Sequence, residues 1–524
     1  MASFESHLTF PLPTPRNIFE VPETIFPARL ILKLTGSPLI SPLYPPPPLK
    51  IYICRYLHHS TKGTAAITGI IMDLNKLYSA TRLGYNAINQ DHRTVFQRDF
   101  DRIIFSSSFR RLQNKTQVFP LPGSVFVHNR LTHSLEVASV GRSLGTLAGE
   151  FIAENFKSQL SEESIEFYKY NLYNVVAAAA LCHDIGNPAF GHSGEDAIAS
   201  YFVQNESSLR AQFSAGEWDD FLHFEGNANA IRILTQQQNG KSGGSFNLTT
   251  STLASIAKYP CESSARQKNG ALHRKKFGFF RSEASQFEEI ARNTSMIRES
   301  ESPVIYKRHP FVWLVEAADD ICYTIIDLED AHRLSIIEHS ACIDLLLNLI
   351  GCVGKGDIER TKNQLNNIGD KNDKIGFLRA KAIHALTMRS TEIYKEKIDS
   401  ILTGECQRSI MDTIGDECKP LKDIVSFSIS YIYNHRSVVE IENAGYNVMS
   451  ELLSHFIPPV LASAEFRTKS QKKAVQLIPE QFRYNEGTNY EKVMGVLDYV
   501  SGMTDNYATD LYRKIKGIEI GMTV

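Results

Sequence analysis

Apolar residues recur along this chain in runs that suit helices, and strand-like alternation is scarce. Beyond residue 336 the periodic runs are 345–350, 383–401, 421–433 and 438–456, with glycine-marked interruptions at 351, 354, 356, 404 and 415. Spacing near 3.6 residues indicates helices that bury one face. The pattern therefore predicts a mainly α fold, without an internal repeat of fixed period.

One small, apolar run, 175–181, reads VVAAAAL and ends just before His183 and Asp184. A buried helix there would leave this His-Asp pair at its carboxyl end. The residues GNP at 186–188 then break the helix. Residues 186–194 should therefore form a loop, with the next helix running from Gly194 onward.

The predicted loop carries His192, and Glu195 follows three residues later. An imidazole and a carboxylate this close could hydrogen-bond, with Glu195 orienting His192 and raising its basicity for general acid–base work. The alternative is a helix-capping glutamate beside a solvated histidine.

Residues 312–331 contain neither glycine nor proline and should form one long helix. Asp319, Tyr323 and Asp327 are spaced by four residues and share one face of it. A buried carboxylate without a partner is costly, which favours a metal at Asp319 and a polar ligand along Tyr323 and Asp327. The alternative is a solvent-facing acidic stripe that also includes Glu316, Asp320 and Glu329.

Two histidines and two carboxylates from three predicted helices could hold one divalent cation: His133, His183, Asp184 and Asp319. Nitrogen and oxygen ligands that leave positions open for water and phosphate suit phosphoester hydrolysis. Mixed ligation of this kind suits Mn, Fe, Co or Mg. Taken singly, such a pair is more often a hydrogen-bonded part of the core, but the four together in these contexts favour the metal site.

The order H…HD…D resembles that of the HD phosphohydrolase superfamily, and longer strings resemble its deoxyguanosinetriphosphate triphosphohydrolase branch, the dGTPases and related dNTP triphosphohydrolases. These strings are RDFDRIIFSSSFRRLQNKTQVFPL (98–121), HNRLTHSLEVA (128–138), HDIGNPAFGHSGE (183–195), HFEGNANAIRIL (223–234), KKFGFF (275–280), EAADDICYTIIDLEDA (316–331) and DYVSGMTDNYA (498–508). The resemblance covers about residues 73–520.

The resemblance implies roles for individual residues. It implies that the metal ligands are His133, His183, Asp184 and Asp319, and that His192 and Glu195 are the catalytic pair. It implies deoxyribose contacts from Gln117, Tyr323 and Asp327, and phosphate contacts from Arg130, Lys258, Tyr259 and Lys276. Asn187 stands where several relatives carry histidine, and its amide can still donate a hydrogen bond to a phosphate oxygen.

The implied reaction is metal-dependent cleavage of a 2′-deoxynucleoside triphosphate, dGTP or another dNTP, to the deoxynucleoside and inorganic triphosphate. The cation would polarise the α-phosphoryl group and activate a water, while His192 exchanges a proton with the attacking water or the leaving oxygen. The sequence leaves open the preferred base and whether a second dNTP acts as an effector.

The resemblance also implies a division of the chain. Residues 72–335 would form the HD phosphohydrolase core. Residues 336–524 would be a C-terminal helical region that completes the nucleotide pocket and the contacts of a homo-oligomer, a hexamer or another multiple of two. Within it, the motif NHRSVVEIENAGY (434–446) would supply either polar contacts or structure alone.

Two other classes of function remain open. An HD phosphohydrolase that acts on another nucleotide phosphoester would use the same metal ligands, but it should lack the sugar-facing Gln117 and Tyr323. A non-catalytic nucleotide sensor or nucleic-acid-binding scaffold is disfavoured, because every expected ligand and both acid–base residues are present.

Composition adds few constraints. The chain has 524 residues, 43% of them hydrophobic, and a formal net charge of −2, which suits a globular protein without bulk attraction to nucleic acid. The stretch 266–276 carries five Lys or Arg residues and is either a solvated loop or a lid that gathers phosphates. No stretch of about 20 apolar residues is present, so no membrane span is expected.

The eight cysteines show no CxxC spacing, and Cys182 and Cys322 fall within predicted core helices. Reduced thiols in a cytoplasmic protein are the simplest interpretation.

Residues 1–71 differ from the rest of the chain. They hold eleven of its 21 prolines and show no amphipathic period. We expect this segment to be disordered, or an upstream extension that precedes a working initiator at Met72. A targeting peptide is the competing interpretation, although the opening MASFESHLTF lacks the basic and apolar regions of a secretory signal.

Overall fold

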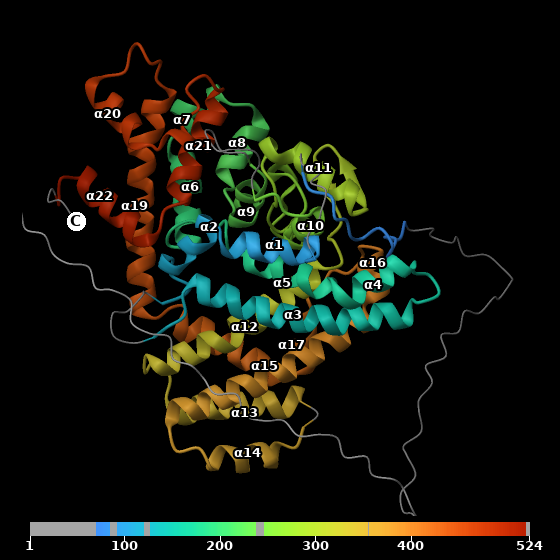
Figure 1. Cartoon of the computed structure of the whole chain (residues 1–524). Coiled ribbons are helices and arrows are strands. Elements are labelled where there is room, and N and C mark those ends of the chain that lie inside the picture. The colour runs from blue at the N-terminus through green and yellow to red at the C-terminus, as the bar shows by residue number, and fades with distance from the viewer. Residues whose placement is uncertain (1–69, 84–91, 120–125, 237–245, 355, 520–524) are drawn as a thin grey trace, which may run out of the picture. The chain divides into compact units, whose positions relative to one another are not determined.

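Helix α5 (Leu172–Cys182) lies at the centre of the fold, and all its residues from 175 to 182 are buried. In the computed structural model, which describes residues 70–83, 92–119, 126–236, 246–354 and 356–519, the long helix α3 (Arg130–Asn155) runs along it (Figure 1). Gly145 permits this close approach, because a Cβ atom there would lie 2.7 Å from the Cα atom of Tyr173. The expected disorder of 1–71 concerns a segment that, up to residue 69, lies outside the described residues.

The helices that precede the small sheet are mostly short. Besides α3 and α5, they are α1 (Val95–Ile104), α2 (Ser107–Arg110), α4 (Glu162–Tyr170), α6 (His192–Gln204), α7 (Glu206–Leu209), α8 (Ala215–Leu222), α9 (Gly226–Thr235), α10 (Thr250–Ile256) and α11 (Ala284–Asn293). In the described part of the chain, the one sheet is the antiparallel pair β1 (Arg298–Glu301) and β2 (Val304–Tyr306).

The second half of the chain is helical throughout the part that the structure describes. Its helices are α12 (Val312–Arg333), α13 (His339–Val353), α14 (Ile358–Asn366), α15 (Lys371–Glu396), α16 (Ile398–Leu402), α17 (Ile410–Glu417), α18 (Lys419–Phe427), a π-helical turn (Ser428–Ile432), α19 (Arg436–Leu461), α20 (Lys469–Leu477), α21 (Asn489–Ser501) and α22 (Asp505–Ile515). Shorter 3-10 turns lie at Arg111–Asn114, Arg210–Gln212, Ser263–Ala265, Leu272–Arg274, Arg281–Glu283 and Glu480–Phe482. The predicted mainly α fold is confirmed.

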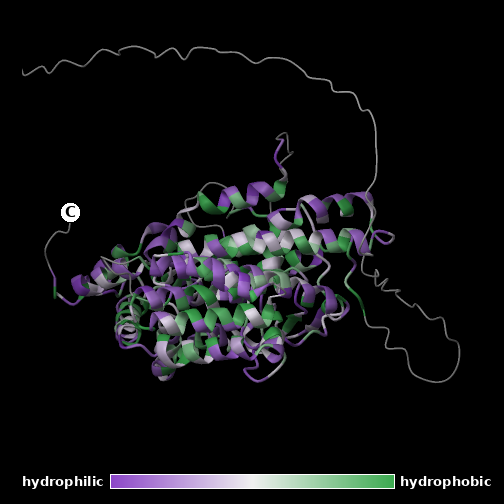
Figure 2. Ribbon diagram, turned by 90° about the horizontal axis from the view of Figure 1, so that it is seen from below, coloured by the Kyte–Doolittle hydropathy of each residue, from purple (hydrophilic) through white to green (hydrophobic). Residues whose placement is uncertain are grey.

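The buried apolar residues form two clusters. Helices α3, α5, α12 and α15 contribute to the first, and α6, α8, α19 and α21 contribute to the second. Hydrophobic and hydrophilic residues occur side by side along the helices of the molecule (Figure 2). The chain passes from one cluster to the other after α5, because Ile185 belongs to the first and Ala189 to the second.

Several predicted boundaries need correction. Helix α6 begins at His192 rather than at Gly194, because Gly191 takes the left-handed φ of 58° that ends the loop. Gly351 and Gly415 lie within α13 and α17, so neither interrupts a helix. The predicted helix 312–331 is confirmed as α12, which continues to Arg333.

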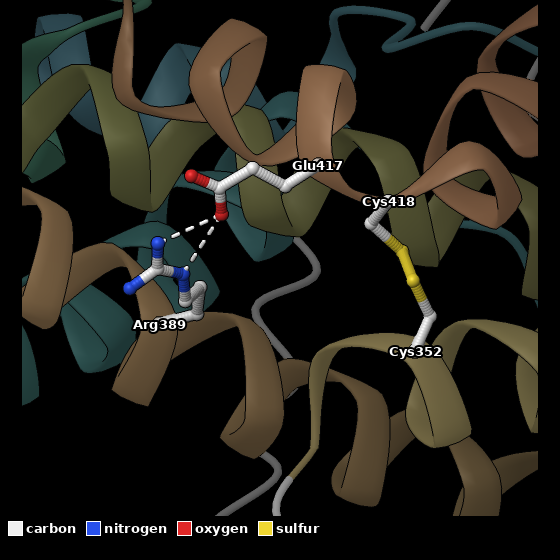
Figure 3. Close-up of a disulfide and its surroundings, with 4 residues drawn as sticks. All are labelled: Cys352, Arg389, Glu417 and Cys418. Atoms are coloured by element: carbon white, nitrogen blue, oxygen red, sulfur yellow. Dashed lines mark hydrogen bonds and ion pairs between the residues drawn. A yellow bond between two sulfur atoms is a disulfide. The ribbon is translucent and has the colours of Figure 1, made fainter.

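The expectation of reduced thiols is wrong for Cys352 and Cys418, which form a disulfide (Figure 3). Cys352 lies on α13 and Cys418 joins α17 to α18, 66 residues away, yet their Cα atoms are 5.9 Å apart. Local spacing does not reveal a pair that tertiary packing creates. Cys182 and Cys322 are free and buried, as the helical patterns predicted.

None of the described helices combines the length and the apolar character that crossing a membrane requires.

Candidate active site

Three side chains from separate elements meet at one point: His133 of α3, His183 just after α5, and Asp319 of α12. The Nε2 atoms of His133 and His183 lie 3.1 Å and 3.4 Å from Asp319 Oδ1. One donor atom from each residue lies within 4.8 Å of the other two. Two imidazole nitrogens and a carboxylate oxygen this close can share one divalent cation.

The local backbone orients His183 for this role. Its Nδ1 atom lies 2.7 Å from the carbonyl oxygen of Ala180. Since a carbonyl only accepts, Nδ1 donates to it, and Nε2 is the nitrogen left on the side of Asp319. Burial alone would lower the pKa of His183, but the charges of Asp184 and Asp319 outweigh it and raise the pKa to about 9, so a cation would displace a proton from Nε2. Nε2 is buried and forms no hydrogen bond with any residue that the structure describes, which leaves it available as a ligand.

Asp184 has different surroundings from the other three expected ligands. Arg130 Nη1 donates to Asp184 Oδ2 over 2.6 Å, and Asn187 Nδ2 donates to Oδ1 over 2.7 Å. Asp184 Oδ2 lies 3.6 Å from His183 Nε2, at the border of the cluster. The structure therefore turns Asp184 toward Arg130 and Asn187, two residues for which the sequence predicted phosphate contacts.

A cavity of about 370 Å³ opens beside the cluster. It is lined by every residue that the sequence predicted for catalysis, metal or substrate, except His133 and Asp327. These lining residues are Gln117, Arg130, His183, Asp184, Asn187, His192, Glu195, Lys258, Tyr259, Lys276, Asp319 and Tyr323. Side chains from the loop after α5, from α3, α12 and the segment around residue 276 thus converge on one space.

His192 and Glu195 lie at one wall of this cavity, but no hydrogen bond joins them in the described structure. Glu195 Oε1 instead accepts a hydrogen bond of 2.7 Å from the backbone amide of Gly226. Burial, followed by repulsion from Glu225, raises the pKa of Glu195 to about 8. Enclosure of the imidazole, followed by the charge of Lys276, lowers the pKa of His192. The two groups therefore differ in protonation: the Glu195 carboxyl tends to hold its proton, whereas the His192 imidazole tends to lose one.

Two lysines bring positive charge to the cavity. Lys258 Nζ lies 3.3 Å from Glu316 Oε1, and Lys276 Nζ donates to Glu225 Oε1 over 2.9 Å. Burial alone would lower the pKa of each lysine, but the neighbouring carboxylates outweigh it and raise both values. Both ammonium groups therefore stay charged at neutral pH.

The basic stretch 266–276 contributes only its last residue, Lys276, to the lining of the cavity. His273 Nε2 lies 2.9 Å from Glu299 Oε2, and Arg274 Nε donates to the carbonyl oxygen of Ala265. These contacts tie the stretch to β1 and to its own turn. The interpretation of the whole stretch as a phosphate-gathering lid is therefore wrong for the structure observed.

Of the predicted sugar-binding residues, Gln117 and Tyr323 line the cavity and Asp327 does not. Gln117 Oε1 is buried and accepts no hydrogen bond from the described residues. Tyr323 stacks on Tyr433, with ring centroids 5.4 Å apart and planes at 22°. Tyr433 also donates from its hydroxyl to Asp327 Oδ2 over 2.9 Å, so Asp327 lies behind the tyrosine pair.

The solvent-facing acidic stripe weighed for α12 is wrong. Glu316 is 7% exposed and accepts a hydrogen bond from Arg308 over 2.8 Å. Glu329 is 2% exposed and accepts from Arg333 and Arg379 over 3.0 and 2.6 Å. Each buried carboxylate has a cation from another part of the fold or from the next helical turn.

Sequence reasoning missed three residues that shape this site: Glu225, Glu316 and Tyr433. For Tyr433 a signal existed, because it directly precedes the motif at 434–446. For the two glutamates the decisive fact is their contact with Lys276 and Lys258, which depends on tertiary packing.

Comparison with known proteins agrees with this geometry. The HD domain model matches residues 130–258, and the phosphohydrolase-associated domain model matches residues 410–514. A deoxyguanosinetriphosphate triphosphohydrolase-like protein of Synechocystis sp. is 37% identical over 86% of this chain and all of its own length. The chain belongs to the HD-domain deoxyguanosinetriphosphate triphosphohydrolase family.

Other relatives extend the family match. A protein of the same description from Pseudomonas aeruginosa is 35% identical over 85% of this chain and 99% of its own. A deoxyguanosinetriphosphate triphosphohydrolase of Cronobacter sakazakii is 29% identical over 81% of this chain and 94% of its own. Membership makes this chain an HD-domain hydrolase. The HD match includes His133 and His183, whereas Asp319 follows it and Tyr433 lies in the associated domain.

Proposed function

We propose that this chain hydrolyses 2′-deoxynucleoside triphosphates to the deoxynucleoside and inorganic triphosphate. The observation that carries the proposal is one cavity beside the His133, His183 and Asp319 cluster, lined by His183 and Asp319, by the charged Lys258 and Lys276, and by the aromatic ring of Tyr323. The names of the relatives add support, because they describe dGTP triphosphohydrolases and proteins like them.

The donor set fits a divalent cation. The partnerless Nε2 of His183 and the short distances to Asp319 Oδ1 are the observations that support this fit. When bound, such a cation supplies charge stabilisation to a phosphoryl group and makes a nearby water a better nucleophile. Asp184 would join the ligands from its present position 3.6 Å from His183 Nε2, and Arg130 would then be free to bind a phosphate oxygen.

Lys258 and Lys276 would bind the remaining phosphates as charged donors. Both lie on the cavity wall and both keep their protons at neutral pH. Fixed cations that neutralise the negative charge of the phosphates usually strengthen substrate binding and raise the rate of phosphoryl transfer.

His192 would move the proton. Its imidazole is exposed toward the cavity and its lowered pKa leaves it neutral near pH 7. It would therefore accept a proton at an imidazole nitrogen from the attacking water and return it to the leaving 5′ oxygen. Glu195 would hold the adjacent backbone of Gly226 in place rather than orient His192 directly.

The sugar and base would lie on the α12 side. The buried Oε1 of Gln117 offers an unused acceptor, and the stacked ring of Tyr323 offers a flat surface to a deoxyribose. A second cavity of about 540 Å³ shares Asp320 and Tyr323 with the first. Its apolar residues suit a nucleobase: Met411, Leu421, Val425 and Ile429.

Product analysis tests the proposal. The protein is incubated with each dNTP and each rNTP, singly and mixed, in Mn²⁺ or Mg²⁺, and products are separated by chromatography. We expect deoxynucleoside and intact triphosphate, and no turnover by the matched His183→Ala variant. Orthophosphate or pyrophosphate with a nucleotide co-product would contradict attack at the α-phosphorus. Turnover of a different phosphoester alone would contradict the substrate class.

A further inference from the structure

The loop between α5 and α6 has an unusual backbone. Phe190, which is not a glycine, has a φ of 62°, and Gly191 next to it has a φ of 58°. A left-handed conformation at a residue other than glycine is unfavourable and persists only when surrounding contacts hold it. His192 follows directly, so the contacts that hold this turn also decide where His192 points.

The carboxylate of Asp505 makes one of the contacts that hold this turn. Asp505, the first residue of α22, is 8% exposed. Its Oδ1 atom accepts a hydrogen bond of 3.0 Å from the backbone amide of Phe190. Its Oδ2 atom accepts one of 2.8 Å from the backbone amide of Thr116. A single side chain thus joins the segment that carries His192 to the segment that carries Gln117.

Carbonyl groups at the start of the same loop also accept hydrogen bonds from side chains. Lys115 Nζ donates to the carbonyl oxygens of Asn187 and Ser501 over 2.5 and 3.0 Å. Asn229 Nδ2 donates to the carbonyl oxygen of Gly186 over 2.7 Å and to Ser501 Oγ over 3.3 Å. Lys115 and Asn229 therefore hold the start of the loop and link it to Ser501 at the end of α21, while Asp505 holds the end of the loop.

The ring of Phe190 packs against α19 at Gly445. A Cβ atom built on Gly445 would lie 2.4 Å from Phe190 Cγ, so only a glycine leaves room for the ring in this position. Gly445, Ser501 and Asp505 all lie within the match to the phosphohydrolase-associated domain, 410–514. The loop itself lies within the HD domain match.

We propose that Asp505 is a positioning residue through which the associated domain sets the catalytic loop. Its carboxylate fixes the amides of Phe190 and Thr116 and so holds in place the two segments that carry His192 and Gln117, both of which line the cavity. The catalytic part of this inference rests on the proposed function. The anchoring of the loop does not, and the experiments separate the two.

The first experiment compares Asp505→Asn with Asp510→Asn. Asparagine keeps the size of the side chain but turns one of its two acceptors into a donor, which would face a backbone amide. Asp510 lies on the same helix, and its carboxylate is 49% exposed and 3.7 Å from Arg513, so it is a matched control. A misplacement near 1 Å can cost on the order of 100-fold in rate. We expect kcat to fall roughly 10- to 100-fold in Asp505→Asn, with unchanged metal content, and to stay constant in Asp510→Asn.

A double-mutant cycle shows whether Asp505 acts through His192. In a His192→Ala background, Asp505→Asn should lower kcat by a smaller factor than in the wild type, because one of the two groups that it positions is already absent and only the placement of Gln117 is still affected. A loss of general stability would lower kcat to the same extent in both backgrounds, and that result would overturn the proposal. Loss of bound metal in Asp505→Asn would overturn it as well.

Amide exchange followed by mass spectrometry tests the anchoring without substrate. Peptides that cover 115–118 and 186–192 should exchange faster in Asp505→Asn than in the wild type and in Asp510→Asn. If the wild type hydrolyses no dNTP but this exchange rises, the proposed function fails while the anchoring is supported. If exchange is unchanged, the inference fails whatever the substrate.

A second variant covers the case in which Asp505→Asn does not fold. Gly445→Ala leaves Asp505 intact and disturbs the loop from the other side, because its methyl group would displace the ring of Phe190. It should show the same fall in kcat and the same rise in exchange at 186–192. Normal kcat and normal exchange in a folded Gly445→Ala protein would count against positioning by the associated domain.

Discussion

Arg232→Met should be the most destabilising of the single substitutions considered for this protein. Arg232 of α9 is 3% exposed, and its guanidinium binds Asp498 of α21 through two parallel hydrogen bonds of 2.7 and 2.8 Å. The same guanidinium donates to Glu283 over 2.6 Å. The side chains of Asp498 and Glu283 are 7% and 3% exposed. Methionine has a similar length, so the main loss is the charge and its hydrogen bonds.

The magnitude follows from what remains. Removal of one partner from a buried ion pair costs about 3–5 kcal/mol, because the other charge stays buried without compensation. Here two carboxylates lose the same cation, so the upper part of that range applies. Arg513→Met is the matched control: its side chain is 48% exposed and lies 3.7 Å from Asp510, and an exposed pair contributes about 0–1 kcal/mol.

Denaturant unfolding at several pH values is the assay. Burial already raises the pKa of Glu283 above its ordinary value in the wild type, and loss of Arg232, whose charge lowers that pKa, should raise it further in the variant. The variant then gains stability as pH falls, relative to the wild type, because its folded state binds more protons. The difference in unfolding free energy should therefore be largest near pH 8 and smaller near pH 5. A difference below about 1 kcal/mol, or one that does not change with pH, would refute the reasoning.

Three further predictions concern the site itself. His183→Ala and Asp319→Ala should each lose both bound metal and turnover, and full metal occupancy by elemental analysis would contradict the ligand assignment. His192→Ala should keep its metal but lose on the order of 10²–10⁴-fold in kcat, and a loss of metal would instead make His192 a ligand. Tyr323→Ala should lower kcat/KM for dNTPs and narrow their advantage over rNTPs, by about 5- to 150-fold, because the flat ring no longer disfavours an unpaired 2′ hydroxyl. Steady-state kinetics with paired dNTP and rNTP substrates measures this effect, and an unchanged preference would return Tyr323 to a packing role.

Local sequence patterns were sufficient to predict helices, which depend on interactions between residues close in sequence. The run 175–181 became α5, and 312–331 became α12, because a helix depends on residues three and four positions apart. His183 followed α5 as predicted, and the spacing of Asp319 placed it on the face of α12 that meets His133 and His183. The boundaries were less accurate, since the start of α6 depends on the backbone conformation of Gly191 rather than on a hydrophobic period.

Contacts between distant segments were beyond local patterns. Tyr433 reaches Asp327 across 106 residues, and Cys352 reaches Cys418 across 66. The number of residues between the two members of such a pair does not reveal the contact, because the whole fold decides which distant segments meet. The expected link between Glu195 and His192 erred for the opposite reason. Closeness in sequence suggested a hydrogen bond, whereas the start of α6 directs Glu195 to Gly226.

The cost of burying a carboxylate connects these cases. Applied to α12, it indicated that Asp319 and Asp327 need partners, and the structure supplies two histidines for one and Tyr433 for the other. The same rule applies to the string DYVSGMTDNYA, where Asp498 and Asp505 flank apolar residues. Both are buried, and their partners are the guanidinium of Arg232 for Asp498 and the backbone amides of Thr116 and Phe190 for Asp505. A carboxylate within an apolar segment therefore marks a contact that the fold must make, while the identity of the partner follows only from the fold.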